Sequence, residues 1–292
     1  MQNNSTGGFG FGNIPEVTKN LLIINVLMLV ATVAVGNALS IDLRDYLGLH
    51  LWLADDFNPI QIITNMFMHG DFTHLFFNMF VLWMFGSILE SHVWGSKKFL
   101  VYYLLTGIGA GILYSVTAYW EILPTLSLLD AFMDSPSVAT LNELSNAHKF
   151  WVDPNYNYDM YTAFTDFKQN AALYEANPSN AVAMNSAVTF VSDYKDYYLN
   201  LRTAVGASGA VYGLLLAFGM FFPNELLYIY FLIPVKAKYV VIVLAAAELY
   251  FGVVNSPGDN IAHFAHLGGM LFGFILIKFF GFDFNNKNGK LS

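Results

Sequence analysis

The sequence predicts an all-α membrane protein, a bundle of six transmembrane helices with a mostly helical soluble insert between the third and the fourth helix. Three observations predict this fold class. The chain of 292 residues is 56% hydrophobic and 12% charged, which is more apolar surface than one soluble core can bury. The apolar residues gather in blocks, and several blocks reach the roughly 20 residues that cross about 30 Å of hydrocarbon. One long polar stretch separates the third block from the fourth.

Six apolar blocks, bounded by turn residues and charges, mark the expected transmembrane helices. The segment before them, residues 1–19, holds no basic run of the kind found in signal or transit peptides, so we expect the first helix to remain attached. The six helices are expected at residues 20–37, 73–92, 99–119, 204–222, 238–255 and 261–281.

The first long connection, residues 38–71, separates the first two expected helices. It mixes Trp52 and several leucines with Asp55 and Asp56, which suits a segment lying in the membrane interface. We therefore expect residues 20–119 to form the first three helices with an interfacial loop between the first and the second.

The second long connection, residues 120–202, is rich in Asn, Asp, Tyr and Ala and is too polar to enter hydrocarbon. Apolar positions within it recur at helical spacing, so we expect a small helical soluble insert. The last three transmembrane helices follow within residues 203–281. The apolar positions of the insert include Leu126, Leu129, Phe132 and Met133.

The distribution of basic residues predicts the orientation in the membrane. With a cytoplasmic N-terminus, the inner segments hold eight cations and the outer segments five. We therefore expect both tails, residues 1–19 and 282–292, in the cytoplasm and the insert outside it, in a bacterial inner (plasma) membrane. The eight inner cations are Lys19, Lys97, Lys98, Lys236, Lys238, Lys278, Lys287 and Lys290; the five outer ones are Arg44, Lys149, Lys168, Lys195 and Arg202.

The composition also excludes several function classes. There is no cysteine, which excludes a disulfide framework, a thiol nucleophile and a cysteine-ligated metal. A formal net charge of -8 without basic runs gives no electrostatic footprint for nucleic acid.

A cluster of small residues around Ser208 opens the fourth expected helix. Gly206 and Gly209 flank it, and Tyr212 follows one helical turn later. Such small residues by themselves are typical of a face where membrane helices pack closely. A functional interpretation therefore needs a base nearby.

A histidine cluster opens the sixth expected helix and offers that base. His266 is followed by Gly269 and lies at the same expected depth as Ser208. Close backbone contact between the two helices would bring the serine hydroxyl within hydrogen-bond reach of the imidazole, the pairing that activates a weak nucleophile. Ser208 and His266 are thus candidate catalytic residues, whereas a lone histidine here would more often be a hydrogen-bonded bundle residue.

His74 and Asn78 lie four residues apart at the start of the second expected helix and share one face. Neutral donors on one face near a nucleophile are what an oxyanion hole requires, and the backbone N–H of Ser208 is a further donor. The alternative is an interfacial His74 with Asn78 in an interhelical hydrogen bond.

No acidic residue is expected to orient His266. Asp259 falls in an outer loop, Glu248 lies inside the fifth expected helix, and Glu90, at the inner end of the second, suits a helix-end partner. A Ser/His pair with Tyr212 packed against the imidazole is the more economical arrangement.

These residues together resemble the rhomboid family of intramembrane serine proteases, of bacterial type. His74 and Asn78 match the H-x-x-x-N element of the family, and Gly206 to Gly209 are similar to its G-x-S-G nucleophile motif. The resemblance covers five stretches spread over the expected bundle, namely residues 59–70, 74–79, 86–95, 206–212 and 265–273.

The resemblance implies a serine-type endopeptidase that hydrolyses a peptide bond in or near the transmembrane segment of single-span or other membrane-protein substrates. It implies Ser208 as nucleophile, His266 as general base and acid, and His74, Asn78 and the Ser208 amide as oxyanion donors. It implies no metal or organic cofactor. The chain departs from the family in lacking a Trp-Arg pair in the first loop and in its long insert, for which we hypothesise a role in restricting or guiding substrate access.

Three other classes compete with this interpretation. A metal-binding membrane protein would use His263 and His266 with His69 and His74 as four imidazole ligands, although we expect His69 and His263 to lie in water. An inactive relative would bind client helices without cutting them. A carrier or channel is supported only by the isolated Glu248.

Overall fold

The computed structural model describes residues 14–229, 232–254 and 262–282. Asp259, the residues joining the fifth and sixth expected helices, and most of the two tails lie outside this described part. The chain divides into two compact units. We call the first the membrane unit and the second the insert unit. The membrane unit consists of Met1–Leu49, Asn58–Tyr114 and Thr203–Ser292, and the insert unit of His50–Phe57 and Ser115–Arg202.

The described residues contain three helical stretches long and apolar enough to cross a membrane, and two shorter apolar helices. The second of the three long stretches, Phe72–Asp134, contains both the second and the third expected helices. The chain is therefore a mostly helical, multi-pass membrane protein, while the count of six spans stays a prediction. The other two long helices are α1 (Glu16–Leu39) and α10 (Ala237–Val254); the shorter ones are α9 (Ser208–Phe221) and α11 (His263–Phe279).

Helices α1 and α10 present apolar side chains outward. Leu27 and Val30 on α1 are each 59% exposed, and Val243 on α10 is 66% exposed. Side chains of this kind, left exposed over the length of an apolar helix, match a lipid surface rather than water.

The stretch Phe72–Asp134 is divided by Gly95, which has a φ of 72°, a conformation that glycine adopts without a steric penalty. Hydropathy predicts a third helix that ends at residue 119, but α5 continues to Asp134. Because Ile122, Leu129 and Phe132 are buried on one helical stripe, packing maintains the helix after the sequence has become polar. The elements before and after Gly95 are α4 (Phe72–Val81), η3 (Leu82–Gly86), η4 (Leu89–Trp94) and α5 (Gly95–Asp134).

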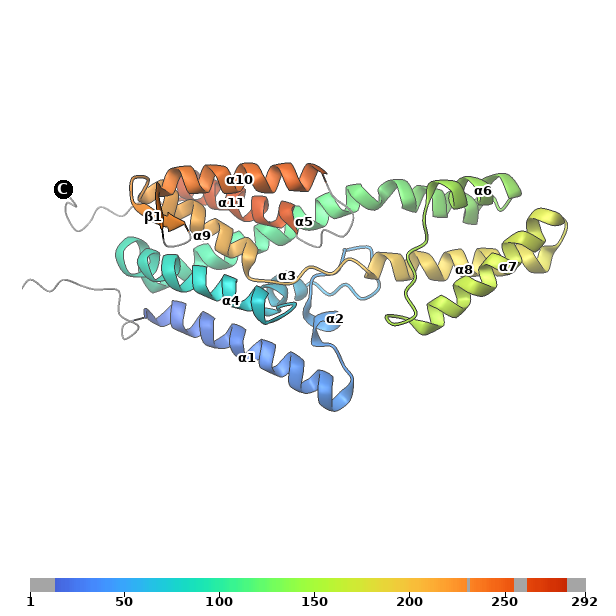
Figure 1. The fold of residues 1–292 in the computed structure, drawn as a ribbon, viewed down its shortest axis with the longest axis horizontal. Helices are drawn as coiled ribbons and strands as arrows, with labels where there is room; N and C mark the ends of the chain where they lie inside the picture. Colours follow the sequence, from blue (N-terminus) through green and yellow to red (C-terminus); the bar gives the residue numbers. More distant parts are fainter. Residues whose placement is uncertain (1–13, 230–231, 255–261, 283–292) are drawn as a thin grey trace, which may run out of the picture. The chain divides into compact units, whose positions relative to one another are not determined.

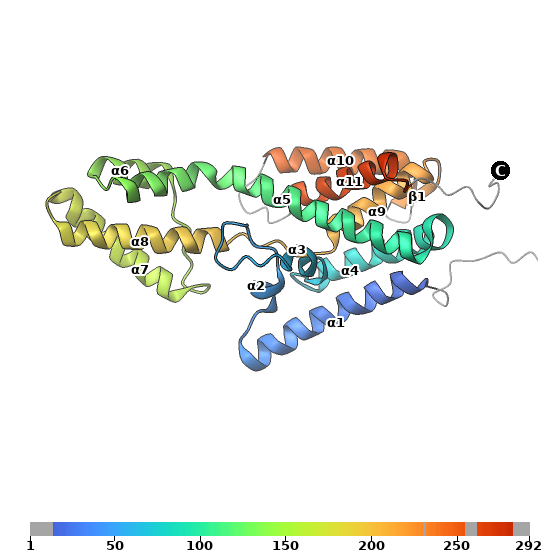
Figure 2. The same ribbon diagram turned by 180° about the vertical axis from the view of Figure 1, so that it is seen from behind.

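Within the membrane unit, α9, α10 and α11 lie side by side in both views (Figures 1 and 2). Small residues allow α9 and α11 to touch through their backbones. On α5, the hydroxyl of Tyr102 donates a hydrogen bond of 2.9 Å to the carbonyl of Gly213 on α9. Helix α9 therefore packs against both α5 and α11, and α5 and α11 also touch each other, at Gly109 and Gly268.

The first long connection is folded, with short helices and one backbone bridge. Leu49 pairs with Ala204 in an antiparallel bridge, with both backbone hydrogen bonds at 2.9 Å. Leu49 and Leu51 are each 1% exposed, whereas Trp52 is 42% exposed. The expectation that all these apolar residues face the interface is therefore wrong for the two leucines. The short helices here are α2 (Leu43–Leu47), α3 (Gln61–Thr64) and η2 (Asn65–Phe67).

A two-stranded antiparallel hairpin, which the sequence did not predict, connects α9 and α10. Its strands, β1 (Leu226–Ile229) and β2 (Ile233–Lys236), pair Leu226 with Lys236 and Ile229 with Ile233.

The insert unit is mostly helical, as the sequence predicts. Polar residues begin its helices: the side chains of Ser137, Asn157 and Asn180 each accept a hydrogen bond from the backbone N–H three residues later, which satisfies one orphan donor per helix. Phe167 and Phe190 stack with ring centroids 4.4 Å apart in its core. Its helices after α5 are α6 (Val138–Ala147), α7 (Tyr158–Ala176) and α8 (Ala181–Asn200).

Glu90 is the helix-end partner that the sequence predicts. It is 2% exposed, and its carboxylate accepts hydrogen bonds from the backbone N–H groups of Val17 (3.0 Å) and Thr18 (2.8 Å). It also accepts bonds from the hydroxyls of Thr18 (2.8 Å) and Ser96 (2.7 Å). It therefore caps the N-terminus of α1 from another helix.

Replacing Glu90 by glutamine is expected to reduce the free energy of unfolding by about 2–3 kcal/mol, because the amide NH₂ cannot accept the N–H bonds and the charge at the helix N-terminus is lost. The measurement is the thermal unfolding of the purified protein in detergent. A midpoint equal to that of the wild type would contradict the capping role.

Candidate active site

Ser208 is the first residue of α9, as the sequence predicts. The preceding segment is held at two points: Ala204 pairs with Leu49, and the N–H of Gly206 donates a hydrogen bond of 2.9 Å to the carbonyl of Asn65. The first N–H groups of a helix have no partner within the helix, and the helix dipole is positive there. The backbone at Ser208 is therefore suited to binding a developing negative charge.

Gly206 brings the backbone next to His74. Its φ is 129°, and a Cβ at this position would lie 2.8 Å from Cε1 and from Nε2 of His74 and 3.6 Å from Oγ of Ser208. Only glycine therefore fits between the two side chains. The structure thus places the His74 imidazole beside the segment that carries Ser208.

His266, on the first turns of α11, lies against Ser208. Its Nε2 is 2.9 Å from Oγ of Ser208, and the histidine is 8% exposed. In the neutral imidazole one ring nitrogen carries the proton and the other accepts. With the proton on Nδ1, Nε2 accepts the hydrogen bond of the serine hydroxyl, which is the arrangement that precedes proton transfer.

Backbone contact between α9 and α11 produces this distance. A Cβ on Gly269 would lie 1.8 Å from the carbonyl oxygen of Gly209, and a Cβ on Gly209 would lie 2.3 Å from Cβ of Ala110 on α5. Neither position has room for a side chain. Gly209 and Gly269 therefore allow the two helices to meet through their backbones.

Tyr212 packs on the imidazole of His266, with the ring centroids 4.1 Å apart and the planes inclined by 6°. Stacking of this kind restrains the histidine ring from one face. The hydroxyl of Tyr212 donates a hydrogen bond to Oε1 of Glu248.

Glu248 corrects the expectation that no acidic residue is available to His266. It is 8% exposed on α10, and its Oε2 lies 3.0 Å from Nδ1 of His266. This contact lacks the alignment of a hydrogen bond. The same oxygen lies 2.6 Å from Nδ1 of His263, within hydrogen-bonding distance. Glu248 is thus not an isolated carboxylate in the fifth helix, which removes the support for a carrier or channel.

Asn78 lies one turn after His74 on α4, and its Nδ2 donates a hydrogen bond of 2.9 Å to the carbonyl of His74. An amide NH₂ has two hydrogens, so this bond holds the side chain along the helix and leaves one hydrogen for another acceptor. Asp71 caps the same helix by accepting from the N–H of His74 at 2.9 Å.

The four histidines of the metal alternative form two separate pairs. His69 packs on His74, with ring centroids 5.1 Å apart, while His263 and His266 gather around Glu248. His69 and His263 are 1% and 8% exposed, so the expectation that they lie in water is wrong. Burial, with a smaller effect of the neighbouring His74, lowers the pKa of His69 to about 4 and keeps that ring neutral.

Among the described residues, one group of carboxylate and imidazole side chains is compact enough to bind a metal ion. Its donor atoms all lie within 4.8 Å of one another, and its members are Glu248, His263 and His266. Such a donor set is chemically able to hold a metal ion. It combines two of the four expected histidines with a carboxylate that the sequence did not suggest for this role.

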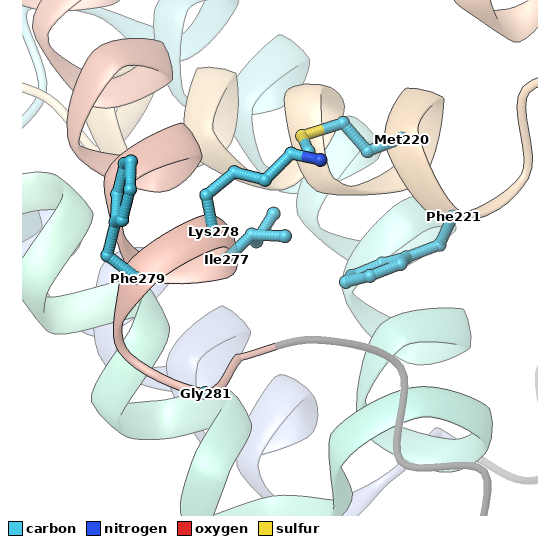
Figure 3. Close-up of a pocket in the computed structure, with 6 residues that line it drawn as sticks. All are labelled: Met220, Phe221, Ile277, Lys278, Phe279 and Gly281. Atoms are coloured by element: carbon cyan, nitrogen blue, oxygen red, sulfur yellow. The ribbon is translucent and has the colours of Figure 1, made fainter.

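A hollow of about 360 Å³ lies at the opposite ends of α9 and α11. It is lined by Met220, Phe221, Ile277, Lys278, Phe279 and Gly281 (Figure 3). Because Ser208 and Met220 are separated by more than three helical turns, this hollow is not part of the Ser208 site.

Comparison with protein families matches residues 56–122 and 171–281, more than half of the chain, to the rhomboid domain. The matched ranges include Ser208, His266, His74, Asn78 and Glu248. Comparison with curated proteins gives no significant match, and neither does comparison with solved structures.

Proposed function

Because the chain belongs to the rhomboid family, we propose that it is an intramembrane serine endopeptidase that cleaves a peptide bond in or near the transmembrane segment of membrane-protein substrates. Most members of the family are serine peptidases, and inactive members exist. The observation that carries the proposal is the distance of 2.9 Å between Oγ of Ser208 and Nε2 of His266.

In the proposed reaction, Nε2 of His266 takes the proton of the Ser208 hydroxyl as Oγ attacks the scissile carbonyl carbon. The resulting oxyanion accepts hydrogen bonds from the backbone N–H of Ser208, from His74 and from Asn78. The imidazolium then gives its proton to the leaving amine. Water, deprotonated by the same imidazole, hydrolyses the acyl-enzyme and frees Ser208.

The proposed orientation puts both termini in the cytoplasm and the insert outside it, in a bacterial inner membrane. Its support is the excess of basic residues in the segments assigned to the inside. Ser208, His266 and His74 all lie in the first turns of their helices. In this orientation the starts of α4, α9 and α11 face outward, where water for hydrolysis is closest.

The test is cleavage of a tagged single-span reporter by the purified full-length protein in detergent, combined with labelling by a fluorophosphonate that reacts with activated serines. We expect a defined cleavage product, covalent labelling at Ser208 identified by mass spectrometry, and no effect of a chelator on either. Failure of the wild type to label at Ser208 would indicate an inactive family member. Cleavage that a chelator abolishes would indicate a metal-dependent mechanism.

A further inference from the structure

We propose that Glu248 is a positioning residue of this site, because its carboxylate lies 3.0 Å from Nδ1 of His266 and tethers the ring of Tyr212 that stacks on that imidazole. This inference rests on the proposed function and adds a third polar partner to the Ser208 and His266 pair.

Glu248 is 8% exposed within an apolar helix that is long enough to cross a membrane. A carboxylate buried there is costly unless its oxygens are paired, so it is expected to have a function and identifiable partners.

Both oxygens of the Glu248 carboxylate are directed at the site. Oε1 accepts from the hydroxyl of Tyr212, and Oε2 contacts Nδ1 of His263 at 2.6 Å and Nδ1 of His266 at 3.0 Å. Three side chains from α9 and α11 thus converge on one carboxylate from α10.

The carboxylate of Glu248 also affects which ring nitrogen of His266 carries the proton. A carboxylate near Nδ1 favours the tautomer that carries the proton on this nitrogen, which leaves Nε2 free to accept the proton of Ser208. The approach at 3.0 Å is not aligned, and catalytic hydrogen bonds of this kind often tighten only when substrate is bound. The same anion would stabilise the imidazolium that forms during the reaction.

Two further side chains, Tyr212 and His263, contact the Glu248 carboxylate. Tyr212 stacks on His266 and is tethered to Oε1, so Glu248 restrains the stacked ring as well as approaching Nδ1 of the imidazole. His263, which is itself 8% exposed, contacts Oε2 through Nδ1 at 2.6 Å. His263 therefore contributes by holding the carboxylate.

The distances favour a hydrogen-bonded network over a bound metal. Two ligands at about 2.0 Å from a tetrahedral zinc ion lie roughly 3.3 Å apart. Nδ1 of His263 and Oε2 of Glu248 are 2.6 Å apart, which is shorter than this separation and fits a hydrogen bond between the two atoms.

The experiment compares wild type, Glu248→Gln and Glu248→Asp in the full-length protein, by the rate of fluorophosphonate labelling at Ser208 and by kcat and KM for the reporter. We expect Glu248→Gln to lower the labelling rate and kcat roughly 100-fold, with KM within about twofold. Glu248→Asp, which keeps the charge, is expected to recover part of this loss. Glu90→Gln is the matched control, since it removes a buried carboxylate far from Ser208 and is expected to leave kcat unchanged.

If the wild type is labelled at Ser208 and Glu248→Gln has the same labelling rate and the same kcat, this inference is overturned and the proposed function stays intact. Absence of labelling in the wild type would overturn both. If Glu248→Gln does not fold, Tyr212→Phe decides: it keeps the stacked ring and removes the tether, and a kcat equal to wild type would overturn the inference. Activity that is lost with a chelator and restored by Zn²⁺ would overturn it in favour of a metal site.

Discussion

Replacing Ser208 by alanine is expected to lower kcat for the reporter by about 10⁴-fold or more and to abolish fluorophosphonate labelling. Replacing His266 by alanine is expected to cost nearly as much, because the hydroxyl at 2.9 Å then has no base. The double variant should lose no more than either single variant, since the two side chains act as a unit. The measurement is steady-state cleavage with each variant at matched concentration of folded protein.

Ser127→Ala is a suitable control for the serine substitution. In the wild type, the hydroxyl of Ser127 donates a hydrogen bond of 3.0 Å to the carbonyl of Leu123 within α5, so this serine has a local role only. We expect wild-type kcat from this variant. Cleavage that survives in Ser208→Ala would contradict the mechanism, and additive losses in the double variant would mean that Ser208 and His266 act in separate steps.

The sequence alone was enough to predict that Ser208 and His266 lie close together. The same local pattern occurs at both residues. Each residue opens an apolar helix and is flanked by glycines, so two helix starts at the same depth predict a contact. The structure places these side chains within hydrogen-bond distance and gives Gly209 and Gly269 the predicted packing role.

The contact between Glu248 and His266 was not predicted, because the fifth helix is apolar on almost every face. Such a sequence does not indicate which face turns toward its neighbours, and only packing against α11 turns Glu248 inward. Two signals were nevertheless present. A lone carboxylate in an apolar helix needs a partner, and His263 and His266, three residues apart, share one helix face.

The length of α5 was underestimated for a different reason. Hydropathy reports where apolar sequence ends, and Trp120 and Glu121 mark that point correctly. The helix continues because Leu129 and Phe132 are buried within the insert unit. The role of the insert in substrate access stays a prediction.

Replacing Gly269 by alanine is expected to reduce kcat roughly 100-fold and the free energy of unfolding by about 1–3 kcal/mol. The new methyl group would lie 1.8 Å from the carbonyl oxygen of Gly209, so α9 and α11 must separate. The new methyl group is attached directly to the backbone of residue 269, and the group it meets is a backbone carbonyl. No side-chain rotation therefore relieves the clash. The separation would lengthen the distance between Ser208 and His266 beyond hydrogen-bond reach.

Gly36→Ala is the matched control for Gly269→Ala, because it adds the same methyl group to another apolar helix. Its nearest neighbour there would be the carbonyl oxygen of Ile41 at 3.8 Å, an ordinary contact. Alanine favours helix over glycine by about 1 kcal/mol, so this variant is expected to keep wild-type kcat and to unfold at the same or a slightly higher temperature. Equal kcat and equal stability for Gly269→Ala and Gly36→Ala would show that the two helices do not meet through their backbones, and the geometry assigned to Ser208 and His266 would then have to be abandoned.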